Sequence, residues 1–181
     1  MLIEAARSCL LVIDMQERLM AAVQNAEAVI ANAHWLMRIA TRLGVPVVVS
    51  EQYPQGLGPT VTVLKETIHE SMIMTKTHFS CTAEPACQDR IAACNRDQFI
   101  VLGAEAHVCV LQTALGLRAQ GKAVYVMADG VASRRAEDRE LALTRLRDDG
   151  VRVVSREMVA FEWLERAGTN IFKTISREFL R

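Results

Sequence analysis

Three polar side chains of different chemistry follow short apolar runs that are rich in Val, Ile and Leu. Asp14 comes directly after the first run, Lys76 directly after a later run, and Cys109 lies in the segment after the next one. Such runs are typical of buried parallel strands, and ligands of open parallel sheets bind beyond the carboxyl ends of the strands. We therefore expect a carboxylate, an ammonium and a thiol to meet at one edge of a sheet.

Together these three groups could carry out nucleophilic catalysis. A thiol at Cys109, near a helix N-terminus and beside Lys76, is expected to have its thiolate favoured by the helix dipole and the positive charge. Asp14 could take the thiol proton and pass it to a leaving amine. Backbone N–H groups around Glu105 and Cys109 would then face the oxyanion.

Each of the three residues, taken singly, also has a structural explanation. An acid such as Asp14 after a buried strand often serves as a turn or cap residue. Lys76 could be a solvated lysine that protects an edge strand from pairing with another chain. Cys109 lies between two valines and could pack as a small hydrophobic side chain. The coincidence of all three at one predicted edge favours the catalytic interpretation.

The elements that must position these residues alternate short apolar runs with longer segments of helical period. This alternation is typical of an α/β fold in which helices cover both faces of a parallel sheet. Six strands are predicted, at residues 9–13, 45–49, 71–75, 98–102, 123–128 and 151–154. Helices are predicted at residues 25–43, 85–95 and 170–180, and from near His107, Ala136 and Arg156. Residues 50–60, with two prolines and two glycines, are predicted as a loop after the second strand.

Composition limits the classes of function. The 181 residues carry 21 Lys and Arg against 21 Asp and Glu, and 51% are hydrophobic, which predicts one globular domain over residues 1–181. A balanced charge argues against a nucleic-acid partner. The longest apolar run, residues 123–128, is too short to cross a bilayer, so no membrane partner is expected. No export signal is visible, and five cysteines without a CxxC pair fit a cytoplasmic location.

Several segments carry a resemblance to a known family. LLVIDMQ (residues 10–16), TKTHFS (residues 75–80) and GAEAHVCVLQTALGL (residues 103–117) resemble the three motifs of the isochorismatase-like cysteine hydrolase superfamily, in the same order. Three further segments resemble its small isochorismatase-domain-containing branch: EQYPQGLGPTV (residues 51–61), DGVASR (residues 129–134) and FKTIS (residues 172–176). The similarity therefore runs over nearly the whole chain.

The resemblance implies a three-layer α/β/α fold around a mostly parallel, six-stranded sheet. It also implies a catalytic triad of Asp14, Lys76 and Cys109. A non-proline cis peptide shapes the oxyanion hole in this family, and the matching bond joins Ala104 to Glu105. The amides of Glu105 and Cys109 would then be the oxyanion donors.

Two departures from the wider superfamily narrow the chemistry. The nicotinamidases bind a metal through an aspartate and histidines after the second strand, where this sequence reads Ser50-Glu51-Gln52-Tyr53. No metal and no other cofactor is therefore expected. Isochorismatases cleave a vinyl ether without a thiol, so the presence of Cys109 favours cleavage of a C–N bond through a covalent intermediate.

The substrate pocket is predicted from residues near the triad in sequence. Its candidate lining residues are Gln16, Leu19, Gln52, Tyr53, Phe79, His107 and Val108. Apolar walls suggest a small, largely uncharged substrate. The alternative is that Phe79 is a core aromatic and Gln52 an ordinary loop residue.

Two other functions remain open from the sequence. The first is vinyl-ether hydrolysis of the isochorismatase type, and the second is a non-catalytic role in binding, scaffolding or thiol sensing. Cys87 and Cys94 share one face of a predicted helix, which indicates core packing, with metal or redox involvement as the alternative. The helix at residues 25–43 and the terminal helix have enough apolar side chains to cover the sheet and leave an exposed stripe, so a homo-oligomer is expected.

Overall fold

A computed structural model, which describes residues 1–180, contains one six-stranded sheet in the order β3-β2-β1-β4-β5-β6. Every neighbouring pair of strands in it is parallel. The strands are β1 (Ser8–Ile13), β2 (Val47–Gln52), β3 (Ile73–Lys76), β4 (Gln98–Ala104), β5 (Ala123–Ala132) and β6 (Arg152–Val154). The prediction of a mostly parallel sheet is confirmed, and the described sheet has no antiparallel strand.

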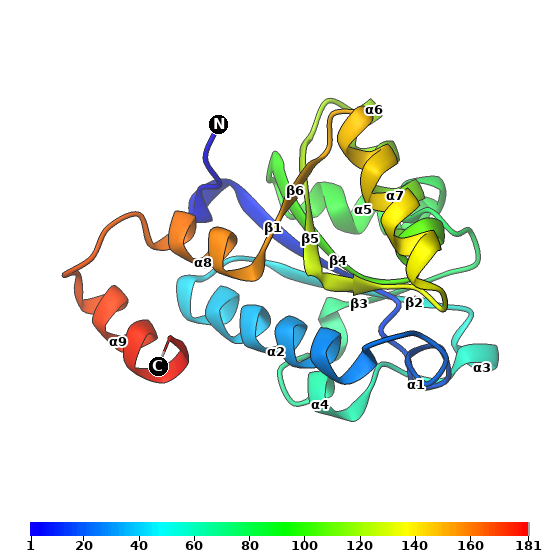
Figure 1. Cartoon of the computed structure of the whole chain (residues 1–181), viewed down its shortest axis with the longest axis horizontal. Helices are drawn as coiled ribbons and strands as arrows, with labels where there is room; N and C mark the ends of the chain where they lie inside the picture. The colour runs from blue at the N-terminus through cyan, green and yellow to red at the C-terminus, as the bar shows by residue number, and fades with distance from the viewer. Residues whose placement is uncertain (181) are drawn as a thin grey trace.

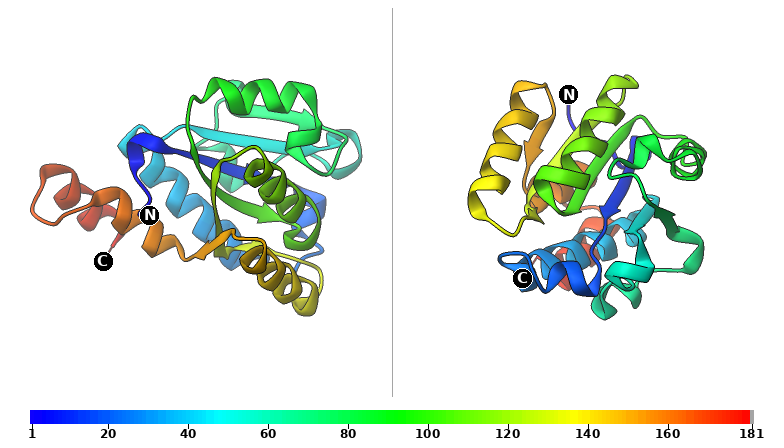
Figure 2. Two further views of the ribbon diagram at one scale, coloured as in Figure 1. Left: turned by 90° about the horizontal axis from the view of Figure 1, so that it is seen from above. Right: turned by 90° about the vertical axis from the view of Figure 1, so that its right-hand side faces the viewer.

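Helices cover both faces of the sheet and give three layers (Figure 1). One face carries α1 (Glu17–Met20), α2 (Ala26–Leu43), α4 (Thr62–Lys65), α8 (Arg156–Leu164) and α9 (Asn170–Phe179). The other face carries α5 (Pro85–Ala93), α6 (Leu111–Ala119) and α7 (Ala136–Asp148). Figure 2 shows the two helical layers on opposite sides of the strands. The predicted α/β/α sandwich is confirmed.

The central strand β1 is buried along its whole length because both of its faces are covered. Leu10 and Val12 pack into the core beneath α2, whereas Cys9, Leu11 and Ile13 pack into the core beneath α5 and α6. This alternation follows from the two-residue period of a strand. Since neither face meets water, the strand is a continuous apolar run rather than an alternating one.

Gly103 allows β4 to approach β1 closely at the carboxyl end of the sheet. Its φ is +126°, and a Cβ atom at this position would lie 2.0 Å from the carbonyl oxygen of Ile13. No side chain fits there, because even alanine would overlap the β1 backbone. The close approach brings the end of β4 against the residue that follows β1, which is Asp14.

The structure corrects the predicted boundaries around the second and third strands. Residues 50–52, predicted as loop, belong to β2, and the short helix α3 (Pro54–Leu57) follows them. β2 begins at Val47 because Pro46 has no N–H to donate to a ladder. The strand predicted at residues 71–75 is displaced to β3, since residues 70–72 form a 3₁₀ turn.

The helix predicted from near His107 begins as a π-helical turn, Ala106–Val110, and continues as α6. Such turns inside a helix occur frequently at functional sites. Within residues 1–180, no helix combines the length and apolar character that crossing a membrane requires.

Candidate active site

A buried ion pair between Asp14 and Lys76 forms the centre of the candidate site. Lys76 Nζ lies 2.7 Å from Asp14 Oδ2, and both side chains are fully excluded from solvent. Asp14 directly follows β1 and Lys76 is the last residue of β3, two strands away in the sheet. The carboxyl edge of the sheet therefore brings together two residues that lie far apart in sequence.

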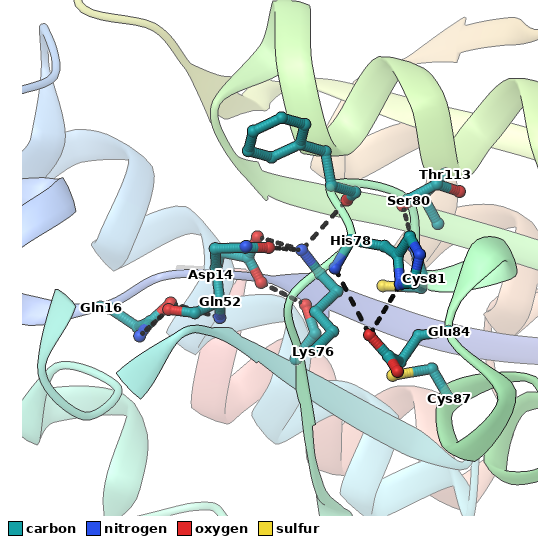
Figure 3. A network of polar contacts seen from close by, with 12 residues as sticks. Asp14, Gln16, Gln52, Lys76, His78, Ser80, Cys81, Glu84, Cys87 and Thr113 are labelled. Carbon is teal, nitrogen blue, oxygen red and sulfur yellow. Dashed lines mark hydrogen bonds and ion pairs between the residues drawn. The ribbon is translucent and has the colours of Figure 1, made fainter. Parts of the chain in front are cut away.

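Lys76 is held by three acceptors. Besides the Asp14 carboxylate, Nζ donates to Gln52 Oε1 at 2.6 Å and to the carbonyl oxygen of Phe79 at 3.0 Å (Figure 3). Burial opposes the charged form of this lysine, but the Asp14 carboxylate, with smaller contributions from Cys109 and Cys81, outweighs burial and raises the pKa of Lys76. Lys76 is therefore an ammonium at neutral pH.

Asp14 is held by its backbone and by a second hydrogen bond. It adopts a left-handed conformation with φ of +49°, which turns its side chain away from the direction of β1. Ser50 Oγ, at the end of β2, donates to Asp14 Oδ1 at 2.5 Å. Each carboxylate oxygen thus has one donor, which fixes the orientation of the group.

Gln16 and Gln52 support the ion pair from the side of β2 (Figure 3). Gln16 Oε1 accepts from the Gln52 N–H at 2.7 Å, and Gln16 Nε2 donates to the carbonyl oxygens of Gln52 and Gly58 at 3.0 and 2.6 Å. Gln52 in turn donates from Nε2 to Thr77 and accepts from Lys76. Both amides predicted to line the pocket are thus occupied in fixing Lys76 and the loop after β2.

Cys109 lies in the π-helical turn and is 5% exposed. Burial raises the pKa of its thiol, and the Asp14 carboxylate raises it further, while the Lys76 ammonium acts in the opposite direction. The net shift is upward, so the prediction of a thiolate at neutral pH is wrong. The main reason is that burial opposes the charged thiolate, and in addition Asp14 offsets the lysine charge that was expected to favour it.

Glu105 begins the turn that carries Cys109. The peptide bond between Ala104 and Glu105 is cis, at the position implied by the resemblance. The Glu105 carbonyl oxygen accepts from the N–H groups of Val108 and Val110, and its carboxylate accepts from Arg134 Nε at 2.9 Å. The main chain and the side chain of Glu105 are thereby both fixed at the end of β4.

The remaining predicted pocket residues divide into three groups. Tyr53 and Phe79 are 54% and 53% exposed. Both flank Lys76, because the Tyr53 N–H donates to its carbonyl oxygen at 2.9 Å and the Phe79 carbonyl oxygen accepts from its Nζ at 3.0 Å. Leu19 packs against the core beneath α2, and Val108 against the core beneath α6. His107 is turned away toward β5 and α7, since its Nδ1 lies 3.0 Å from Ser133 Oγ.

The sequence of the chain matches the isochorismatase domain family over residues 8–158. It is 36% identical over 171 residues to isochorismatase domain-containing protein 2 of Danio rerio, which covers 94% of this chain and 85% of that protein. The chain belongs to the isochorismatase domain family. It is also 39% identical over 150 residues, 82% of this chain, to isochorismatase domain-containing protein 1 of the same species. It spans only 52% of that longer relative.

A solved structure of the MAR1 ribonuclease from Caenorhabditis elegans resembles this isochorismatase domain closely. The TM-score is 0.92 at 33% sequence identity, with 100% of this chain and 93% of that chain covered. The likeness extends over the strands and helices that position Asp14, Lys76 and Cys109.

Two residues near the centre of this isochorismatase domain escaped the sequence analysis. Ser50 binds Asp14 directly, and it could have been found by the same rule that selected Asp14, since it follows the apolar residues of β2. Cys81 is a buried thiol, and the charge of the Lys76 ammonium helps to lower its pKa. It lies in the turn after β3, where the sequence offers no sign of its approach to the lysine.

Proposed function

We propose that this chain is a hydrolase that uses Cys109 to cleave a C–N bond of a small amide-type substrate. The observation that carries the proposal is the buried Asp14–Lys76 pair beside a thiol whose pKa both groups affect. A protonated thiol beside an ionised carboxylate is a nucleophile paired with its own base.

In the proposed reaction, the Cys109 sulfur attacks the carbonyl carbon while its proton passes to Asp14. The negative charge that develops on the carbonyl oxygen is stabilised by the N–H groups of Glu105 and Cys109. Protonated Asp14 then gives its proton to the leaving amine, and the C–N bond breaks to leave a thioester on Cys109. Water attacks the thioester, Asp14 takes a proton from this water, and the thiol is regenerated.

Lys76 keeps its proton throughout the proposed reaction. Before proton transfer, its ammonium offsets the negative charge of Asp14. As the proton leaves Cys109, the ammonium offsets the negative charge that develops on the sulfur. Gln52 and the Phe79 carbonyl oxygen hold it in place, so no reorganisation is needed as charge moves. Tyr53, Phe79 and Val108 supply apolar contacts for a small, largely uncharged substrate at the mouth of the site. The reaction needs no metal or organic cofactor.

A screen of amides, hydroxamates and ureas tests the proposal. We expect turnover of at least one class by the unmodified chain and its loss in Cys109→Ala. Retention of activity in Cys109→Ala would instead favour vinyl-ether hydrolysis, for which an acid and a lysine suffice. A screen in which no compound is cleaved and none alkylates or acylates Cys109 would favour the role in binding, scaffolding or thiol sensing.

Ribonuclease activity is the second candidate function. It is favoured by the 33% identity to the Caenorhabditis elegans chain described as a MAR1 ribonuclease. The equal numbers of acidic and basic residues and the burial of the ion pair argue for a small substrate instead of a polyanion. Incubation with fluorescently labelled RNA decides between them, because cleavage that disappears in both Asp14→Asn and Cys109→Ala would assign the site to RNA.

We also propose that the chain forms a homo-oligomer in the cytoplasm. Support comes from the exposed apolar side chains of Leu2, Met158 and Phe161, which gather where the N-terminus meets α8. The terminal helix α9 instead packs on α2, with Trp35 Nε1 donating to the carbonyl oxygen of Phe179 at 2.8 Å. Light scattering on Phe161→Glu tests this surface, and an unchanged mass would exclude it.

A further inference from the structure

Two neighbouring thiols, outside the candidate active site, lie at the opposite end of the sheet from Asp14. Cys9 is near the start of β1, Cys94 directly follows α5, and their sulfur atoms are 3.6 Å apart. The two residues are separated by 85 positions in sequence. Cys9 is fully buried, whereas Cys94 is partly exposed, so Cys94 is the member of the pair that lies nearer to solvent.

The surroundings of the pair make its two sulfurs unequal. A hydrogen bond from Cys9 lowers the pKa of Cys94 to about 7, against the effect of burial, and the charges of Arg90 and Arg96 add to this shift. The hydrogen bond and burial both raise the pKa of Cys9. With a pKa of about 7, roughly half of Cys94 is thiolate at neutral pH, while Cys9 stays protonated. In its protonated form, Cys94 Sγ donates to the carbonyl oxygen of Arg90 at 3.5 Å. An accessible thiolate with a second thiol beside it is the arrangement found in redox-active pairs.

Arg96 strengthens this assignment by a separate observation. Its Nε is buried and has no hydrogen-bond partner among residues 1–180. The positive charge of the same side chain favours the thiolate forms of both Cys9 and Cys94, because it acts to lower both pKa values. A guanidinium with an unused donor near a thiolate would also stabilise an oxidised, negatively charged sulfur.

We propose that Cys9 and Cys94 are a peroxide-reactive site that closes to a disulfide. The Cys94 thiolate attacks one oxygen of hydrogen peroxide, the O–O bond breaks, and the leaving hydroxide takes a proton to become water. The sulfenic acid on Cys94 is then attacked by the Cys9 sulfur, which loses its proton as the S–O bond breaks and a second water leaves. Two thiols are oxidised to one disulfide, and one peroxide is reduced to two waters.

Closure requires the two sulfur atoms to approach from 3.6 Å to about 2.0 Å. The movement falls on the side of Cys94, because Cys9 is fixed within the central strand. Cys94 directly follows the last residue of α5 and precedes Asn95. Asn95 is exposed, has a φ of +49° and lies outside any helix or strand. A short segment outside regular structure can accommodate such a shift at lower cost than a buried strand.

The chain provides an internal comparison for this site. Cys81 and Cys87 form another neighbouring pair, but both are fully buried, so peroxide reaches neither of them directly. Cleavage after Lys and Arg places these two thiols together on residues 77–90. It places Cys9 on residues 8–18, Cys94 on residues 91–96 and Cys109 on residues 97–118. Each site therefore reports separately in a peptide digest.

The test treats the intact chain with hydrogen peroxide at pH 7.5, blocks remaining thiols and digests it without reduction. We expect a linked species of residues 8–18 and 91–96, reversed by dithiothreitol, with Cys94 lost at least tenfold faster than Cys87. The same result is expected in Cys87→Ser, and no linked species in Cys94→Ser. Conversion of Cys94 to a sulfinic or sulfonic acid without the link, or loss of Cys94 no faster than Cys87, would overturn the proposal. The comparison of two thiols within the unmodified chain does not depend on any variant folding.

Discussion

Each end of the sheet holds a cysteine beside basic residues, yet the pKa values of the two thiols are shifted in opposite directions. At the carboxyl end, Asp14 and burial together raise the pKa of Cys109 in spite of Lys76. At the other end, Cys94 faces a thiol donor and two arginines, and its pKa falls to about 7. A nearby cation therefore does not identify a reactive cysteine, because burial and a neighbouring carboxylate can together raise the pKa of a thiol in spite of the cation.

The contrast separates two kinds of reactivity. About half of Cys94 is already ionised at pH 7 before it meets a reagent, so its reactivity is a property of the resting chain. Cys109 is protonated at rest and needs Asp14 to remove its proton as a bond forms. General alkylation would therefore report on Cys94, and turnover on Cys109.

Removal of each sulfur gives the largest expected difference between the two ends. Cys109→Ala is expected to lower kcat by at least about 10³-fold, because the nucleophile is lost. Cys94→Ser should leave kcat within about twofold, since it lies far from the reacting atoms. Steady-state rates on any substrate found in the amide screen measure both. Equal losses in the two variants would remove the distinction between the ends.

Loss of the buried Lys76 ammonium tests whether the stability of the carboxyl end of the sheet depends on the ion pair with Asp14. Lys76→Met leaves Asp14 buried without its partner, at an expected cost of about 3–5 kcal/mol in unfolding free energy. For a chain of this length, the midpoint of thermal unfolding should fall by ~6–20 °C. Lys65→Met, on the exposed end of α4, is the matched control and should change it little. A midpoint that is equal in both variants would contradict the role of the ion pair.

The pH dependence of alkylation should differ between the two thiols. With a pKa of about 7, roughly half of Cys94 is thiolate at pH 7, whereas less than about 1% of a thiol with a raised pKa is ionised. Alkylation of Cys94 by iodoacetamide should therefore level off above pH 8, while that of Cys109 keeps rising beyond pH 9. At pH 7 the rate of alkylation is expected to be at least ~50-fold higher for Cys94 than for Cys109. Quantitative peptide mass spectrometry measures both curves, and coincident curves would exclude the opposite shifts.

The support of Lys76 by Gln52 gives a smaller expected effect. Gln52→Ala removes one of three acceptors of the Lys76 ammonium, and we expect kcat to fall about tenfold with little change in KM. Gln55→Ala, on the exposed surface of α3, serves as the control. A change confined to KM would instead assign Gln52 to substrate contact.

The sequence predicted the fold well because its strands are long apolar runs separated by clear helical periods. Asp14 and Lys76 could be placed at one edge by the rule that parallel strands end together. The protonation state of Cys109 could not be predicted, because it depends on how deeply the thiol is buried and on the distance of Asp14 from the lysine, and not on residue types. The roles of Gln16 and Gln52 were missed for a related reason, since β2 extends through residues taken for loop and orients both amides inward.

The Cys9–Cys94 pair illustrates the same limit. Helical spacing grouped Cys94 with Cys87, yet the sulfur that Cys94 meets belongs to a strand 85 residues away. Only the packing of α5 against β1 makes this contact. Pairing across elements is not encoded in the spacing of either element alone.

The central claim is that burial and Asp14 together keep Cys109 protonated at rest, and that Asp14 acts as its base during the reaction. Asp14→Asn tests it directly, because asparagine has nearly the same shape and tolerates the left-handed backbone at this position. Without the carboxylate, the contribution of Asp14 to the raised pKa of Cys109 is lost, while burial still opposes the thiolate. Alkylation of Cys109 by iodoacetamide at pH 7, followed on residues 97–118, should rise about tenfold while turnover is lost. An unchanged or slower alkylation in a variant that unfolds like the unmodified chain would contradict the account.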